Sequence, residues 1–99
     1  MQNEDFCFRR LTVTGCVSRL KTRVDAGVCS LYFDLTVNRS SKPAKVLRAC
    51  GEFWGPSLEI AKQVQDGSTV TATGCLDEID HASVRKLRGF DLEQLLKVT

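Results

Sequence analysis

Apolar and polar residues alternate along several stretches of the chain, and alternation with period two is typical of strands that bury one face. The clearest example runs from 31 to 38, where Leu31, Phe33 and Leu35 alternate with more polar side chains. A similar pattern begins at 11, and Gly15 interrupts its apolar side, as glycine often does at a bend or bulge. The alternation predicts strands at about 11–18, 31–38, 46–54, 68–76 and 88–98.

The stretch from 46 to 54 has two faces of different character. One face is apolar and is expected to lie inside the protein, whereas the other mixes charged side chains with a large aromatic ring. The predicted inner residues are Leu47, Ala49, Gly51 and Phe53, and the predicted outer residues are Val46, Arg48, Cys50, Glu52 and Trp54.

Helical spacing replaces the alternation after the third predicted strand, and it predicts a helix over 58–65. Ser57 is expected to cap this helix by accepting a bond from a first-turn N–H, and Gly67 to close it in the left-handed conformation. Polar, basic loops are expected at 19–27 and 39–45. The last stretch, 88–98, also allows a short helix, because the register of its apolar residues is ambiguous.

The order of these elements is strand, strand, strand, helix, strand, strand, which is the order of the OB fold. We therefore predict an all-β protein with a small α insert: a five-stranded OB-fold Greek-key barrel with a short helix between strands 3 and 4. A chain of 99 residues is expected to form a single domain spanning 1–99. Closing the barrel also hides sheet edges that would otherwise be open to water.

Composition favours a small binding protein over an enzyme. No stretch approaches the ~20 apolar residues of a membrane span, and no signal-peptide pattern follows the acidic N-terminus. His81 is the single histidine, and no nucleophile is accompanied by a matching base. The five cysteines are widely spaced without a CxxC pair, so we expect reduced, apolar thiols rather than a metal site. We expect a cytoplasmic protein without metal, cofactor or catalytic residues.

Charge is distributed unevenly along the chain, although the net charge is only +2. Nine basic residues lie between Arg9 and Arg48, and only Asp25 and Asp34 oppose them. The segment from 49 to 99 has the opposite sign, with five basic and eight acidic residues. This asymmetry indicates a surface in the first half that faces a polyanion. The alternative is a scattered set of solvated charges.

In four segments that follow one another in the expected order, the sequence resembles the bacterial single-stranded DNA-binding proteins. An aromatic-Gly pair, Trp54-Gly55, leads into a Leu-Ala helix, and a Gly-Ser turn at Gly67 precedes a strand that ends in Gly-x-Leu. The opening strand with Gly15 and the Phe-x-Leu-x-x-Asn-Arg pattern beginning at Phe33 are also similar. The matching segments are 11–17, 33–39, 53–62, and 66–70 together with 73–76.

This resemblance covers roughly residues 11 to 96, and it implies an OB fold, binding of single-stranded DNA and a homo-oligomer, either a dimer or a tetramer. The short length is similar to that of primosomal replication protein N, a short relative of the family. The chain ends at Thr99, where the general coating proteins continue into an acidic tail that recruits partners. We therefore expect a specialised accessory protein, of a primosome or a mobile element, with replication or recombination proteins as further partners.

A protein that binds single strands needs flat groups on which bases stack and cations that follow the phosphates. Trp54 matches a stacking position of the family, and Tyr32 lies on the outer face of the second predicted strand. The alternatives are a structural tryptophan and cross-strand packing of the tyrosine. Arg48 stands where the family often has an aromatic residue and is expected to stack or to contact phosphate, or else to pair with Asp34 or Glu52.

The remaining candidates are cations that are expected to converge on the rim of the barrel, where OB folds bind their ligands. The alternative for each is an ordinary solvated charge. They come from the two predicted basic loops and from the connection before the last strand: Arg19, Lys21, Arg23, Arg39, Lys42, Lys45, Arg85, Lys86 and Arg88.

The sequence thus predicts a single-stranded DNA-binding protein of replication, recombination or mobile-element DNA processing. Two alternatives remain open at this point. One is an OB-fold protein-interaction subunit of a DNA-processing complex, in which the same faces meet protein. The other is an RNA-binding OB module, because stacking and phosphate contacts do not by themselves distinguish the sugars.

Overall fold

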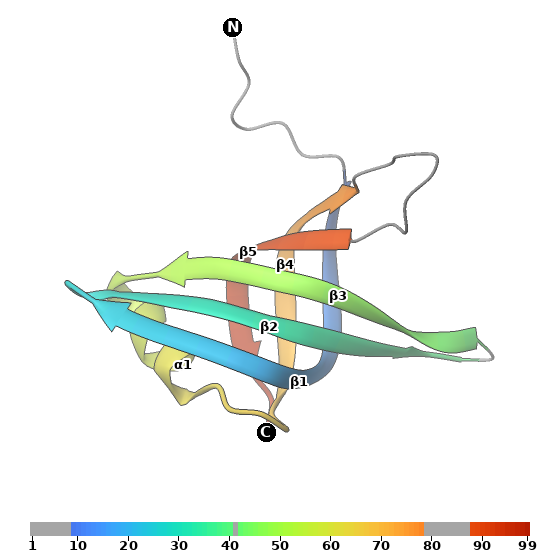
Figure 1. The fold of residues 1–99 in the computed structure, drawn as a ribbon, viewed down its shortest axis with the longest axis horizontal. Helices are drawn as coiled ribbons and strands as arrows, with labels where there is room; N and C mark the ends of the chain where they lie inside the picture. The colour runs from blue at the N-terminus through green and yellow to red at the C-terminus, as the bar shows by residue number, and fades with distance from the viewer. Residues whose placement is uncertain (1–8, 41, 79–87) are drawn as a thin grey trace, which may run out of the picture.

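In the computed structural model, residues 9–40, 42–78 and 88–99 are described, and their strands form a closed barrel (Figure 1). Arg39, Asp77, Glu78 and Arg88 are described by their backbone alone. The strands are β1 (Arg9–Asp25), β2 (Val28–Arg39), β3 (Lys42–Phe53), β4 (Thr69–Glu78) and β5 (Arg88–Lys97). Between β3 and β4 lie a 3₁₀ turn, η1 (Gly55–Ser57), and the helix α1 (Leu58–Gln63).

The barrel closes in the order β1-β2-β3-β5-β4, with a parallel pair between β3 and β5 and antiparallel pairs elsewhere. Strand β1 belongs to both sides of the barrel, because residues 9–16 pair with β4 and residues from 16 onward pair with β2. Gly15 lies just before this change of partner, and a Cβ there would stand 2.5 Å from the Thr36 carbonyl oxygen. The predicted bend at Gly15 and the predicted architecture are both confirmed.

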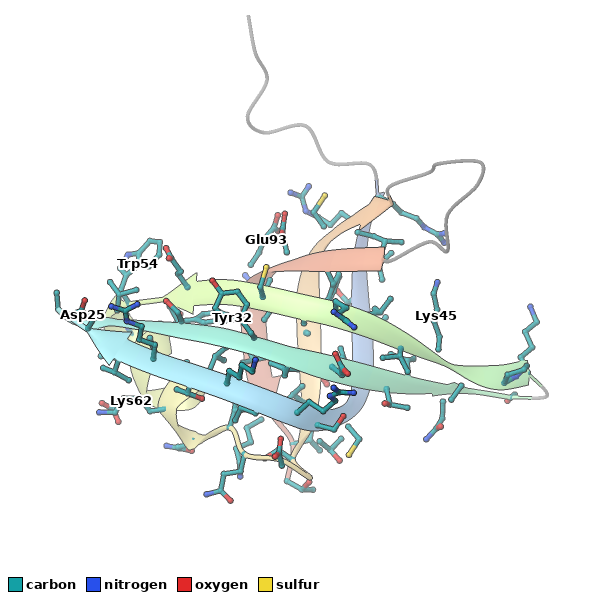
Figure 2. All side chains as sticks on the ribbon, viewed as in Figure 1. Asp25, Tyr32, Lys45, Trp54, Lys62 and Glu93 are labelled. Atoms are coloured by element: carbon teal, nitrogen blue, oxygen red, sulfur yellow. The ribbon has the colours of Figure 1, made fainter. Side chains whose placement is uncertain are left out.

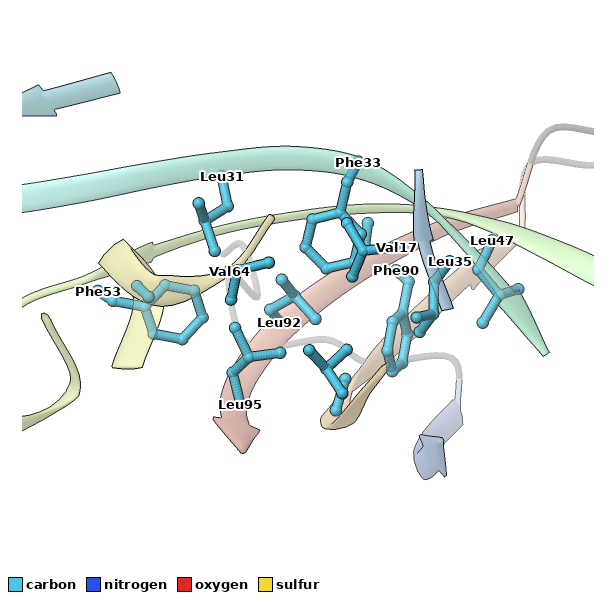
Figure 3. Packing of buried hydrophobic residues seen from close by; sticks show 14 of the residues in the cluster. Val17, Leu31, Phe33, Leu35, Leu47, Phe53, Val64, Phe90, Leu92 and Leu95 are labelled. Atoms are coloured by element: carbon cyan, nitrogen blue, oxygen red, sulfur yellow. The ribbon is translucent and has the colours of Figure 1, made fainter. Parts of the chain in front are cut away.

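The interior of the barrel is apolar and is filled from all five strands and α1 (Figure 3). Leu31, Phe33 and Leu35 of β2 are buried as their alternation predicts, and so are Leu47 and Phe53 of β3. Burying one such side chain contributes roughly 1.5–3 kcal/mol. The two faces assigned to the third strand from its sequence are therefore confirmed: the inner face is buried and the outer face is accessible to solvent.

Most residues of the two loops predicted beside β2 are instead strand, which corrects the sequence interpretation. β1 continues to Asp25 and pairs with β2 up to a turn at Ala26-Gly27, and β3 begins at Lys42. Residues 21–27 are exposed on both faces, because the hairpins reach beyond the barrel. With water on both sides, a strand has no need of alternating apolar residues, and so the pattern that reveals a strand is missing.

The helix between β3 and β4 is shorter than predicted and lacks the predicted cap. Ser57 has a helical backbone (φ −79°, ψ −15°) and makes no side-chain capping bond, because η1 has already begun the turn at Gly55. Gly67 has the predicted left-handed backbone, with a φ of +91°, but it does not close the helix. The helix ends at Gln63, and its C-terminal cap is Val64 in an extended conformation.

The last segment is a strand, so the alternative of a short helix is wrong. Leu92 and Leu95 are both buried although they are three positions apart, a spacing more typical of a helix. A bulge explains this, because Gly74 pairs with Leu92 whereas Thr73 pairs with Gln94, which leaves Glu93 without an opposite residue. The extra residue shifts the alternation by one position.

Among the described cysteines, Cys16, Cys29 and Cys50 are free, as predicted. Cys75 is disulfide-bonded, so the prediction of a reduced thiol is wrong at that position. Cys7 and His81 lie outside the described residues.

Candidate nucleic-acid interface

The outward side chains of β2, of β3 and of β1 from residue 18 onward form one continuous surface, which we call the β1–β2–β3 face (Figure 2). Cross-strand pairing sets the neighbours on this face. Lys21 is opposite Tyr32, and Tyr32 is opposite Cys50. One row away, Asp34 is opposite Arg48. An aromatic ring, two cations and a carboxylate are therefore brought together from three strands.

Two aromatic side chains are exposed on this face. Tyr32 is 57% exposed and Trp54 is 62% exposed, although large aromatic rings are usually mostly buried. Trp54 directly follows β3 in an extended conformation and continues the outward row of Cys50 and Glu52. Tyr32 is opposite Cys50, and Trp54 lies four residues beyond Cys50. The two rings are therefore about 13 Å apart along the strand direction, at ~3.3 Å per residue. Figure 2 shows Trp54 near the end of the sheet and Tyr32 nearer its middle.

A β-bulge in β1 turns Arg19 onto this face. The pairing of β1 with β2 shifts between Ser18 and Lys21, and Arg19 has a φ of 57°. Leu20 packs against the core, and its N–H donates a bond of 2.9 Å to Asp66 Oδ1. A bulge inserts one extra residue and so changes the side to which a side chain points. As a result, two cations only two residues apart, Arg19 and Lys21, border the same part of the face.

These side chains enclose a shallow hollow of about 340 Å³ on the sheet. Its rim is basic and its wall includes the ring of Tyr32, so it offers both kinds of contact that a nucleotide needs. The lining residues are Arg19, Lys21, Tyr32, Phe33, Asp34, Arg48, Ala49 and Cys50.

Asp34 is the acidic group within the hollow and lies between two arginines. Its Oδ1 is 3.6 Å from Arg48 Nε, and its Oδ2 is 3.9 Å from Arg19 Nε. The ion pair with Asp34, one of the alternatives considered for Arg48, is therefore present. Both arginines remain more than half exposed, so their other guanidinium nitrogens face water. The sequence pattern put Asp34 on the outer face and offered Arg48 as a partner, whereas the pair with Arg19 became visible only with the register.

The face as a whole carries charges of both signs. Arg23 pairs with Asp25 at 4.0 Å near the tip of the β1–β2 hairpin. Glu52 lines a second hollow with Arg23 and Tyr32. The excess of positive charge in the first half of the sequence is thus accompanied, in three dimensions, by carboxylates beside the cations. Sequence reasoning missed this role of Glu52, which the alternation of β3 had placed on the outer side.

The structure does not bring all predicted cations to this face. Lys42 is exposed at the start of β3, toward the far end of the β2–β3 hairpin. Lys45 instead borders a separate hollow with Arg9, Leu11 and Val13 of β1. Arg85 and Lys86 lie outside the described residues, and the side chains of Arg39 and Arg88 are not described.

Cys50 lies at the edge of the hollow and is held by a neighbouring strand. Its Sγ donates a hydrogen bond of 3.4 Å to Asp91 Oδ1 of β5. Burial raises the pKa of this thiol, and the hydrogen bond and the negative charge of Asp91 raise the pKa further. The neutral thiol is therefore favoured, which disfavours nucleophilic chemistry at this position.

Residues 9–40, 42–78 and 88–99 contain no group of three histidine, cysteine, aspartate or glutamate side chains arranged to hold a metal ion. No helix within these same ranges is long and apolar enough to cross a membrane.

A closed five-stranded barrel with a helix between its third and fourth strands is an OB fold. No protein-family model matches the chain, and no curated protein matches it. Among solved structures, the chain is similar to the dimeric structure of the N-terminal domain of PriB protein from Thermoanaerobacter tencongensis, with a TM-score of 0.61. The likeness covers 91% of this chain and 96% of that one at 17% sequence identity. At this level of identity, the similarity establishes the fold.

Proposed function

We propose that this protein binds single-stranded DNA along the β1–β2–β3 face and does not act as an enzyme. The observation that supports this most directly is the exposure of Tyr32 and Trp54 on the surface that also carries Arg19, Lys21 and Arg48. Exposed rings beside cations serve a ligand that has both bases and phosphates. The sequence resemblance to bacterial single-stranded DNA-binding proteins supports the same function.

Each group has a distinct role in the proposed complex. Trp54 and Tyr32 stack on bases. Their separation of about 13 Å is suited to an extended DNA strand that runs from one ring to the other. Arg19, Lys21 and Arg48 contact phosphates at the hollow between the rings. Further phosphate contacts are proposed for the cations of the hairpins and around the start of β5: Arg23, Arg39, Lys42, Arg85, Lys86 and Arg88. Lys45 is proposed as a contact beyond this face, because it borders the separate hollow with Arg9.

We further propose that the protein acts as a homo-oligomer in DNA replication, recombination or mobile-element processing. Residues 9–15 of β1 pair with β4 on one side, and within the described residues no strand pairs with their other side. An unpaired strand edge is a template for a second chain. The PriB domain of similar fold is described as dimeric, which supports the same arrangement. Sedimentation at several protein concentrations tests it, and a monomer throughout contradicts it.

Fluorescence titration with oligo-dT tests DNA binding directly, because Trp54 is the single tryptophan of the chain. We expect quenching on binding and an affinity that falls with salt. Neutralising about four phosphates on a single strand gives a slope of about −3 in a plot of log K against log salt. Duplex DNA is the control and should bind more weakly. Oligo-U in competition decides between DNA and RNA, and the absence of both quenching and a mobility shift would contradict the proposal.

A further inference from the structure

Asp34 occupies the position of an anion between two cations on the β1–β2–β3 face. Each of its two carboxylate oxygens faces a different arginine, with Arg48 on one side and Arg19 on the other. The carboxylate is only 19% exposed, whereas the two guanidinium groups are largely open to water. The negative group therefore lies at the bottom of the hollow and the positive groups stand above it.

These two ion pairs are loose. Their N–O distances of 3.6 and 3.9 Å exceed the ~2.7–2.9 Å of a charge-assisted hydrogen bond. Elsewhere on the same protein, Arg10 and Glu93 make two hydrogen bonds of 3.1 and 2.8 Å. The arginines beside Asp34 are thus attracted by charge without being locked in place, and exposed pairs of this kind are weak and screened by salt.

The backbone around Arg19 is built to present it to Asp34. Arg19 adopts the left-handed region at φ 57°, which is unfavourable for a residue with a side chain. The segment is held by the bond from the Leu20 N–H to Asp66 and by a bond of 2.8 Å from the Gly67 N–H to the Val17 carbonyl. A regular strand would direct Arg19 toward the interior, so the bulge is what brings this cation to the carboxylate.

We propose that Asp34 is a built-in competitor for the phosphate groups of the bound strand. In the free protein it attracts Arg19 and Arg48 into the hollow. When a strand binds, a phosphate replaces the carboxylate as their partner, and the displaced carboxylate then repels it. This inference rests on the proposed function. Asp34 lowers the affinity below that of a face with the same cations alone, and it speeds the release of each phosphate, which favours exchange along a strand.

The variant Asp34→Asn tests this inference, because it removes the charge and nearly keeps the shape. We expect Asp34→Asn to bind oligo-dT about fivefold more tightly at physiological salt, because the substitution releases Arg19 and Arg48 from two weak ion pairs. The plot of log K against log salt should steepen by about 0.7, the contribution of one further neutralised phosphate.

Glu59→Gln is the matched control. It also removes one negative charge, but Glu59 lies on α1, outside the β1–β2–β3 face, and pairs there with Lys62 at 3.8 Å. The affinity of this variant for oligo-dT should therefore change less than twofold. An equal gain in affinity in both variants would mean that net charge alone is responsible, and would overturn the inference.

A double-mutant cycle separates competition from a structural role. In an Arg48→Gln background, the gain from Asp34→Asn should fall by half or more, because one of the two cations that Asp34 occupies is gone. Thermal unfolding monitors the fold of each variant. Weaker binding by Asp34→Asn, in a folded protein, would mean that the carboxylate orients the arginines for phosphate, and would overturn the inference while leaving the proposed function intact. A wild-type protein that binds no single strand would overturn the proposed function itself.

Discussion

The outer surface of the barrel has two faces that differ in how closely their polar side chains are paired with one another. On the face formed by residues 10–16 of β1 with β4 and β5, the β1–β4–β5 face, side chains satisfy one another across the strands. Thr12 and Thr73 share a hydrogen bond of 2.8 Å, as do Thr14 and Thr71. On the β1–β2–β3 face, the ion pairs are 3.6 to 4.0 Å long and two aromatic rings lie open to water.

This difference supports the β1–β2–β3 face as the proposed ligand-binding face. Cross-strand pairs of good geometry each contribute roughly 0.2–1 kcal/mol to the sheet, and their donors and acceptors are already occupied. A face that leaves guanidinium nitrogens and rings without close partners keeps that capacity for another molecule. The two faces belong to the same small barrel, so the comparison can be tested with matched substitutions.

Removing an exposed large side chain from each face should produce the largest contrast. Trp54→Ala is expected to weaken oligo-dT binding by about 1–3 kcal/mol, or roughly 5- to 150-fold, because one stacking platform is lost. Leu96→Ala removes a side chain that is 59% exposed on the β1–β4–β5 face and should leave binding unchanged. Fluorescence anisotropy of a labelled oligonucleotide measures both, since Trp54→Ala has no tryptophan signal. Equal effects of the two variants would abolish the distinction between the faces.

Neutralising one arginine on each face should give an intermediate effect. Arg48→Gln is expected to weaken binding by about 1 kcal/mol and to make the salt slope shallower by about 0.7, because one phosphate contact is lost. Arg10→Gln removes the same charge from the β1–β4–β5 face, where the guanidinium is already hydrogen-bonded to Glu93. Its binding curve and salt slope should match those of the wild type. A shallower salt slope for Arg10→Gln would show that the DNA strand also contacts the β1–β4–β5 face.

The smallest expected effect concerns the stability of the β1–β4–β5 face. The hydrogen bonds from Arg10 are the main cause of a lowered pKa of Glu93, and the positive charge of Arg10 adds to the shift. A carboxyl with a lowered pKa stabilises the folded state above its ordinary pKa of 4.5 and loses that contribution as pH falls through the lowered value.

We therefore expect Glu93→Gln to reduce the melting temperature slightly at neutral pH. The difference from the wild type should vanish in acid, once Glu93 of the wild type is protonated. Glu59→Gln serves as the control, because Glu59 forms only a 3.8 Å pair with Lys62 on α1. A difference that persists unchanged in acid would contradict the assignment of the stability to this pair.

The interior of the protein could be predicted from sequence because burial leaves a regular trace. Leu31, Phe33 and Leu35 lie in the core, as their alternation indicates. Arg48 and Trp54 are exposed, as the alternation of β3 indicates. In these strands one face meets the core and the other meets water, which forces the alternation. The five strands and their order followed from this pattern.

The features that the sequence did not reveal depend on local backbone conformation or on contacts between distant segments. The hairpin ends look like loops because both faces are solvated. The bulges at Arg19 and Glu93 change the side to which residues point, and no residue type in the sequence marks their positions. The contact between Asp34 and Arg19 depends on one of these bulges, so it became visible only with the register of β1 and β2.

The bulge in β1 also determines how the protein tolerates changes in chain length. Deleting Leu20 would remove the extra residue of the bulge and turn Arg19 toward the interior, while the rest of β1 kept its register with β2. A deletion at the Ala26-Gly27 turn would shorten only a solvated hairpin. The orientation of this surface is thus encoded by the number of residues in one strand, as much as by their chemistry.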